Sequence, residues 1–91
     1  MRYVAIDGQN DVEMMLMTAD RRDWRVRIDL GTLGRLAEHR IASDEDARGT
    51  VNQHMTSLIM GTLRVIGRGG VGDVVRLSAA DLRLPPIAKA A

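Results

Sequence analysis

Residues 43–70, SDEDARGTVNQHMTSLIMGTLRVIGRGG, decide the fold because they contain the start, the buried stripe and the end of one amphipathic helix. Ser43 can cap the free amides of the first turn, and the three acidic residues after it complement the helix dipole. A stripe of mostly apolar side chains then recurs at steps of three and four, at Ala47, Val51, Met55, Leu58, Ile59, Thr62 and Ile66. The helix is expected to end at Gly67, Gly69 and Gly70, because glycine readily enters the left-handed conformation.

Alternating residues before this helix predict strands. Tyr3–Ile6 reads as a short edge strand that ends at a turn of Gly8 to Asp11. Val12–Thr18 places Val12, Met14, Leu16 and Thr18 on one face, and a mixed set of Glu13, Met15 and Met17 on the other. The cleanest alternation lies in Trp24–Leu30, with Trp24, Val26, Ile28 and Leu30 opposite Arg25, Arg27 and Asp29. Val74–Leu77 predicts one more strand after the long helix.

A shorter helix is predicted between the strands and the long helix, from Leu33 to Ala42, with Thr32 as its N-cap. Gly61 lies in the apolar half of the long helix, which indicates a close approach to another element. Ser78–Leu82 is expected to form a turn or a single helical turn, and Pro85 and Pro86 to end ordered pairing.

Together these elements predict the α+β class in one domain, residues 1–84, followed by a C-terminal tail, residues 85–91. The expected chain order is β-β-β-α-α-β. Consecutive strands favour an antiparallel sheet of three to four strands, with two helices packed on one face in a two-layer arrangement. The pattern leaves open whether residues 3–6 pair within this sheet or with another chain.

Composition narrows the functional classes. The 13 basic and 12 acidic side chains give a net charge of +1, so no overall field attracts nucleic acid or a membrane. The absence of Cys excludes disulfides, thiolate catalysis and cysteine zinc sites, and fits a cytoplasmic location. No apolar run approaches the roughly 20 residues that span a bilayer. With 91 residues and no Phe, the core is small, so we expect a homo-oligomer.

Several segments carry a family resemblance: Val26–Leu30, the short Leu-rich helix, Ser43–Ala47, Ile59–Gly69 and Leu77–Leu82. Together they resemble a small bacterial family catalogued as domain of unknown function 1488, over roughly Val12 to Leu82. Its members are short stand-alone α+β proteins, so the resemblance implies the fold class given above. Because the family has no established activity, it implies no catalytic or binding residue.

The candidate catalytic motifs do not point to a reaction. The glycines from Gly67 to Gly72 have dinucleotide-loop spacing, but they follow a helix rather than a strand, which favours a helix end over a phosphate loop. His39 and His54 fall on different elements, with no Cys and no paired metal-ligand spacing nearby. Consecutive helical residues point apart, so the three acidic residues 44–46 are not expected to converge. We therefore predict no catalytic residue, no cofactor and no metal.

One candidate interaction surface is predicted, at residues that share the first strands and their connection: Arg21, Arg22, Trp24, Arg25, Arg27, Met15 and Met17. Guanidinium groups beside an indole can contact phosphates and stack on bases. Nearby Asp20, Asp23 and Asp29 can neutralise them, which favours a solvated face or a protein interface. Met15 and Met17 form an apolar strip unless another element covers them.

Three functional hypotheses follow. The favoured one is a non-catalytic protein-interaction or accessory module that acts as a homodimer through the Met15 and Met17 face or an edge strand, or that binds another protein. The alternative is a small nucleic-acid-binding regulator that uses the arginines. The least favoured is an enzyme whose site lies at a subunit interface, with His39 or His54.

Overall fold

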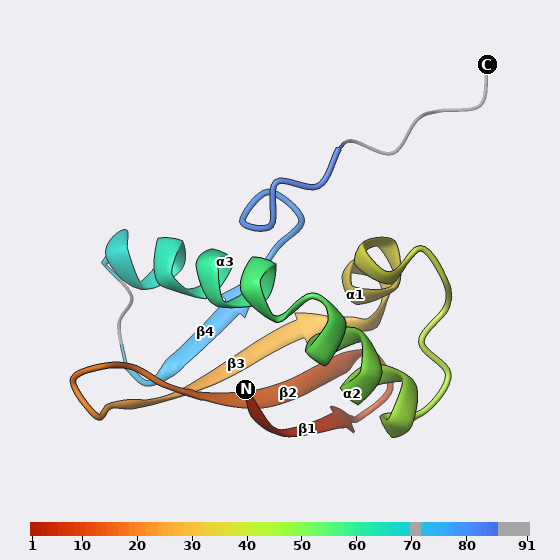
Figure 1. Ribbon diagram of the computed structural model, residues 1–91, viewed down its shortest axis with the longest axis horizontal. Coiled ribbons are helices and arrows are strands. Elements are labelled where there is room, and N and C mark those ends of the chain that lie inside the picture. Colours follow the sequence, from red (N-terminus) through yellow and green to blue (C-terminus); the bar gives the residue numbers. More distant parts are fainter. Residues whose placement is uncertain (70–71, 86–91) are drawn as a thin grey trace.

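The computed structural model describes residues 1–69 and 72–85. Within them the chain forms a four-stranded sheet with three helices on one side, so the α+β class is confirmed (Figure 1). The elements in chain order are β1 (Arg2–Asp7), β2 (Asp11–Met17), β3 (Asp23–Asp29), α1 (Leu30–Ala37), α2 (Asp44–Gln53), α3 (Met55–Gly67) and β4 (Val74–Leu77).

The sheet has the order β1-β2-β3-β4 and is mixed. β1, β2 and β3 form the predicted antiparallel meander, and β1 pairs within the chain with β2. β4 pairs parallel to β3, so the prediction of an antiparallel sheet is wrong for this strand. Three helices separate β3 from β4, and this long connection returns the chain to the end of the sheet where β3 begins.

Period-two alternation sets the two faces of the sheet. Val12 and Met14 of β2 and Val26 and Ile28 of β3 are fully buried against the helices, as predicted. Leu30 is an exception to the predicted strand face, because it is the first residue of α1 and is only half-buried. The edge strand β1 has a register shift between Arg2 and Ala5.

Helix α1 begins earlier and ends earlier than predicted. Its N-cap is Asp29 rather than Thr32: the Asp29 carboxylate accepts hydrogen bonds from the Thr32 backbone N–H at 2.9 Å and from its hydroxyl at 2.6 Å. Glu38 ends the helix in the left-handed conformation, with φ of 61°. Ile41 therefore lies outside the helix, yet it is still buried in the core.

The predicted single helix over residues 43–70 is two helices. Ser43 caps α2 as expected, accepting a hydrogen bond from the Asp46 N–H at 3.1 Å. His54, with φ of −112° and ψ of 25°, breaks the helix between α2 and α3. The break lets α2 pack on β1 and α3 on β4, which lie at opposite edges of the sheet. Gly70, the last residue of the predicted helix end, lies outside the described residues.

The apolar stripe continues through the break and forms much of the core. Ala47, Val51, Leu58 and Thr62 are fully buried, and Met55, Ile59 and Ile66 are half-buried. Gly61 makes the predicted close approach: a Cβ on this residue would lie 2.9 Å from Leu82 Cδ2 and 3.3 Å from the Asp81 carbonyl oxygen. The helix and the turn after β4 are thus in direct contact.

Asp81 organises that turn. Its carboxylate accepts hydrogen bonds from the Ser78 N–H and hydroxyl, both at 2.8 Å, and pairs with Arg68 of the segment after α3. Burial alone would raise the pKa of Asp81, but the Ser78 and Arg68 hydrogen bonds outweigh it and hold the pKa below its usual range. Of the predicted tail, only Pro85 is described, and its carbonyl accepts a hydrogen bond from Arg35.

Candidate interaction surface

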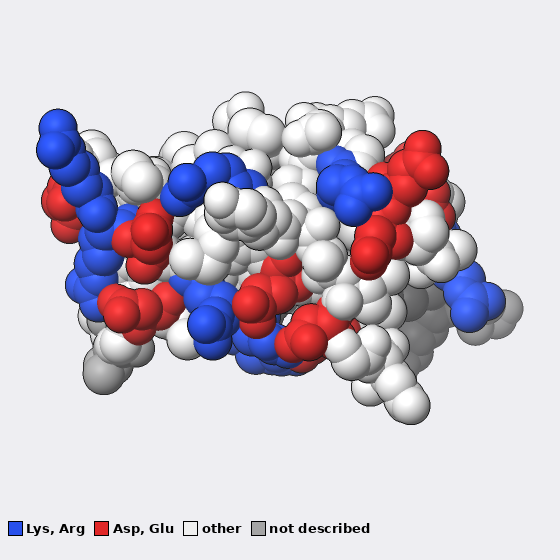
Figure 2. Space-filling view, turned by 90° about the horizontal axis from the view of Figure 1, so that it is seen from below, with Lys and Arg blue, Asp and Glu red and all other residues white. Residues whose placement is uncertain are grey.

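The side of the sheet opposite the helices carries the candidate site, and we call it the open face. Strand alternation and register place on it Arg2, Ala5, Asp7, Asp11, Glu13, Met15, Met17, Asp23, Arg25, Arg27, Asp29, Val74 and Arg76. Figure 2 shows this side from below, with basic and acidic side chains interspersed across it.

The predicted arginine cluster is split by the fold. Arg25 and Arg27 lie on the open face, whereas Trp24 points to the core and is only 3% exposed. Arg22, in the turn before β3, places its guanidinium 4.1 Å from the centroid of the Trp24 ring. Arg21 is exposed in the same turn, with φ of 63°. The indole therefore does not share a surface with Arg25 and Arg27.

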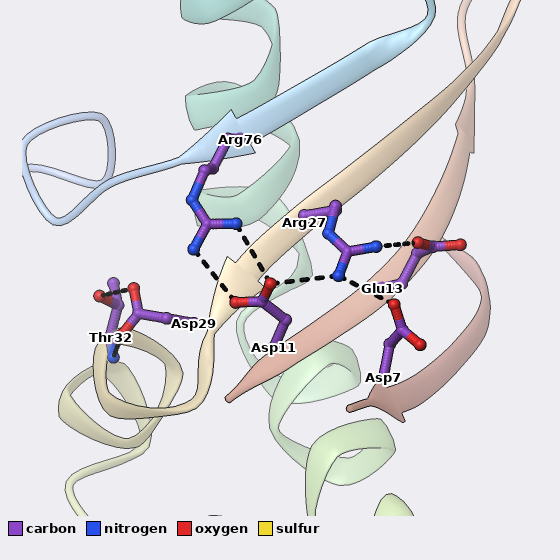
Figure 3. Close-up of polar contacts among 7 residues, drawn as sticks. All are labelled: Asp7, Asp11, Glu13, Arg27, Asp29, Thr32 and Arg76. Carbon is purple, nitrogen blue, oxygen red and sulfur yellow. Dashed lines mark hydrogen bonds and ion pairs between the residues drawn. The ribbon is translucent and has the colours of Figure 1, made fainter. Parts of the chain in front are cut away.

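An ion-pair network connects all four strands on the open face (Figure 3). Arg27 of β3 pairs with Asp7 of β1 at 2.8 Å, with Asp11 of β2 at 3.1 Å, and with Glu13. The Arg76 guanidinium of β4 donates two hydrogen bonds to Asp11, at 3.1 and 3.2 Å. Asp11 thus bridges two arginines from neighbouring strands.

The network fixes the charge of its members. Hydrogen bonds from Arg76, and then from Arg27, lower the pKa of Asp11. The same contacts with Asp11 raise the pKa of both arginines. These groups stay ionised near neutral pH. This is typical of a structural ion-pair network rather than of a site that transfers protons.

Ion pairs neutralise most of the charges of the open face. Four arginines, Arg2, Arg25, Arg27 and Arg76, pair with four carboxylates, Asp7, Asp11, Glu13 and Asp23. Most of these partners come from β1 and β2 rather than from the aspartates nearest the arginines in sequence. Asp29, for example, caps α1, and Asp20 bonds to the Thr18 hydroxyl.

Apolar side chains lie beside this network. Met17 is 50% exposed and Val74 is 49% exposed. Met15 is half-buried on β2, and Arg25 of β3 lies between it and Val74. Met15, Val74 and Arg25 line a hollow of about 490 Å³ together with Asp23 and Asp73. The predicted residues Met15, Met17 and Arg25 thus come together, on a surface that also includes Val74.

The predicted interaction surface did not include Asp11, Glu13, Val74 or Arg76, which also lie on the open face. Alternation in β2 already places Asp11 and Glu13 on the side of Met15, so that signal was present in the sequence. Val74 and Arg76 carried no such signal, because their place beside β3 depends on the parallel pairing of β4.

The other candidate motifs remain apart. His39 is exposed after α1, and His54 is half-buried at the break between α2 and α3. Asp44 accepts a hydrogen bond from the Ile6 N–H, and Asp46 accepts one from the Ala42 N–H. These two carboxylates therefore bind different segments of the backbone. Over residues 1–69 and 72–85, no three His, Asp or Glu side chains gather as metal ligands would.

Helix α3 presents a separate apolar spot. Met60 is 47% exposed and Leu63 is 45% exposed, on the side of α3 that faces away from the core. In the part of the chain that the structure describes, no helix is long and apolar enough to cross a membrane.

Comparison of the chain with family models, with curated proteins and with solved structures finds no match in any of the three. The resemblance to domain of unknown function 1488 therefore stays a prediction.

Proposed function

We propose that this protein is a cytoplasmic, non-catalytic protein-interaction module of the small bacterial family that it resembles, and that it acts as a homodimer through the open face. The observation that carries the proposal is the half-exposure of Met17 and Val74 on a sheet face that the helices leave uncovered. Apolar side chains of this size in water, next to a hollow and rimmed by polar groups, are typical of a protein contact.

The internally paired charges of the open face suit a second copy as the partner, because two such faces do not repel each other. Asp7 and Asp11 lie opposite each other at one end of the open face, while Arg2 and Arg25 flank Met15 further along the strands. A copy turned about a two-fold axis that lies in the face can place its Asp7 and Asp11, with their paired arginines, over Arg2 and Arg25, and the reverse contact follows by symmetry. The charges of the face then remain paired in the dimer.

The same ion pairs count against the nucleic-acid alternative. Arg25 contacts Glu13 at 3.4 Å, and Arg27 is surrounded by three carboxylates. Nucleic-acid affinity depends on unneutralised cations that release counterions from phosphates. Trp24 is buried, so it offers no ring for base stacking.

Sedimentation velocity over a concentration series tests the proposal. We expect the wild type to form dimers and a Met17→Glu/Val74→Glu variant to stay monomeric, because each new carboxylate would be buried without a partner. Met60→Glu is the matched control, since it places the same charge on an equally exposed residue of α3.

A wild type that is monomeric at every concentration would contradict the homodimer. Dissociation by Met60→Glu but not by the double variant would move the contact to α3. Salt-sensitive binding of labelled duplex or single-stranded nucleic acid, lost on Arg25→Ala/Arg27→Ala, would support the regulator instead.

A further inference from the structure

A second hollow, of about 650 Å³, lies away from the open face, at the end of the molecule where the β1–β2 turn meets α1. Its walls include Gln9 and Asn10 of this turn and, from α1 and the segment after it, Arg35, His39 and Arg40. We call it the α1 cleft. Its volume is in the range of small-molecule sites.

The backbone of α1 helps to open the cleft. Gly31 and Gly34 line it one helical turn apart, so that no side chain fills this part of it. Gly34 also allows the segment after α1 to fold back closely onto the helix. A Cβ on Gly34 would lie 3.0 Å from the His39 carbonyl oxygen. The arginine-bearing segment is thus held against the helix.

The charges of the cleft differ from those of the open face. Among the described residues, neither Arg35 nor Arg40 has a carboxylate within ion-pair distance, whereas the four arginines of the open face all do. Arg35 donates to the Pro85 carbonyl, which leaves its positive charge uncompensated. Glu38 is the acidic residue of the lining, against two guanidinium groups. The cleft therefore carries excess positive charge.

The donors suit an oxyanion. Guanidinium groups offer forks of N–H donors that match the oxygens of a carboxylate or phosphate. Gln9 and Asn10 can add amide N–H groups from the facing turn. Leu30 and Ile41 supply apolar surface for the body of a ligand.

We propose that the α1 cleft binds a small anionic metabolite, with a phosphate or carboxylate group held by Arg35 and Arg40. A polymer such as a nucleic acid would need a longer basic track than Arg35 and Arg40 provide. The site is distinct from the open face, so it does not depend on the proposed dimer.

Nuclear magnetic resonance titration of the ¹⁵N-labelled full chain tests this proposal. Inorganic phosphate and succinate are added in separate arms at constant ionic strength, with chloride as the reference anion. We expect saturable shifts at residues 9–10 and 31–41, with the stronger arm identifying phosphate or carboxylate as the preferred group. In Arg40→Gln the affinity should fall about tenfold, the loss expected for one charge-assisted contact.

Arg48→Gln is the control, because it removes one exposed arginine of α2 that does not line the cleft. It should bind like the wild type, and so should the Met17→Glu/Val74→Glu variant, which separates this site from the dimer. The proposal is overturned if neither anion gives saturable shifts, or if Arg40→Gln binds as tightly as Arg48→Gln. Wild-type resonances away from the cleft show that each variant is folded.

Discussion

Asp11 and Arg76 form a two-pronged ion pair across the full width of β3, since Asp11 is on β2 and Arg76 on β4. Arg27, on the intervening strand, also bonds to Asp11. A single carboxylate thereby connects three strands, two of which are distant from it in sequence. This geometry predicts how stability depends on pH.

Asp11→Asn should reduce stability most above pH 5. The folded pKa of Asp11 is lowered, so its contribution is fully present above the unfolded value, about 3.9, and is lost as pH falls through the folded pKa. The difference in free energy of unfolding between wild type and variant should therefore shrink as the pH falls below about 4. Urea unfolding at several pH values measures it. A difference that stays constant with pH would show that the ionised carboxylate is not what matters.

Gly49→Ala and Gly61→Ala should change stability in opposite directions. A Cβ at Gly49 of α2 meets nothing within 4 Å, so alanine should add about 0.5–1 kcal/mol to the free energy of unfolding. At Gly61 the same Cβ collides with Leu82 and crowds the Asp81 carbonyl, so alanine should remove about 1 kcal/mol or more. Chemical denaturation of both variants tests the close approach, and equal stabilisation of the two would refute it.

Asp29→Ala should destabilise the protein by about 1 kcal/mol, because it removes the N-cap of α1. Thr32→Val should cost less, since the Thr32 N–H can still find the Asp29 carboxylate. Thermal unfolding ranks the two variants. The reverse order would restore Thr32 as the cap, as the sequence first indicated.

Arg22→Ala should lower the free energy of unfolding by about 1 kcal/mol, through loss of the cation–π contact with Trp24 and of the ion pair with Asp73. The only Trp of the chain gives a local readout, because its fluorescence should change when the guanidinium is removed. Arg21→Gln, in the same turn, should change neither quantity. Identical fluorescence in the wild type and both variants would place Arg22 away from the ring.

The parts of the fold that could be predicted are those where a local sequence pattern indicates a single structure. Alternation in β2 and β3 identified the buried face, because a strand with one side in water repeats every second residue. The capping role of Ser43 and the close approach at Gly61 were likewise predictable, since each depends on a residue type with a specific backbone use.

The remaining features depend on contacts between distant residues. The break at His54 does not interrupt the apolar stripe in the sequence, because α2 and α3 pack on the same side of one sheet. The helical spacing of buried residues therefore continues from one helix into the next. The direction of β4 is not encoded in four residues. For the candidate site, the alternation of β2 indicated Met15 and Met17, but the neutralising partners of Arg27 come from three positions on β1 and β2.

The parallel pairing of β4 has a consequence for the order of folding. β1, β2 and β3 are joined by short turns and can pair as soon as residue 29 is available, whereas β4 can join only after all three helices have been made. Until then, β3 is an unpaired edge, and the backbone N–H and C=O groups that later pair with β4 are free. We therefore expect this edge to be the region where a nascent chain exchanges strands with a neighbour or aggregates. Pairing of β4 with β3 removes this exposed edge.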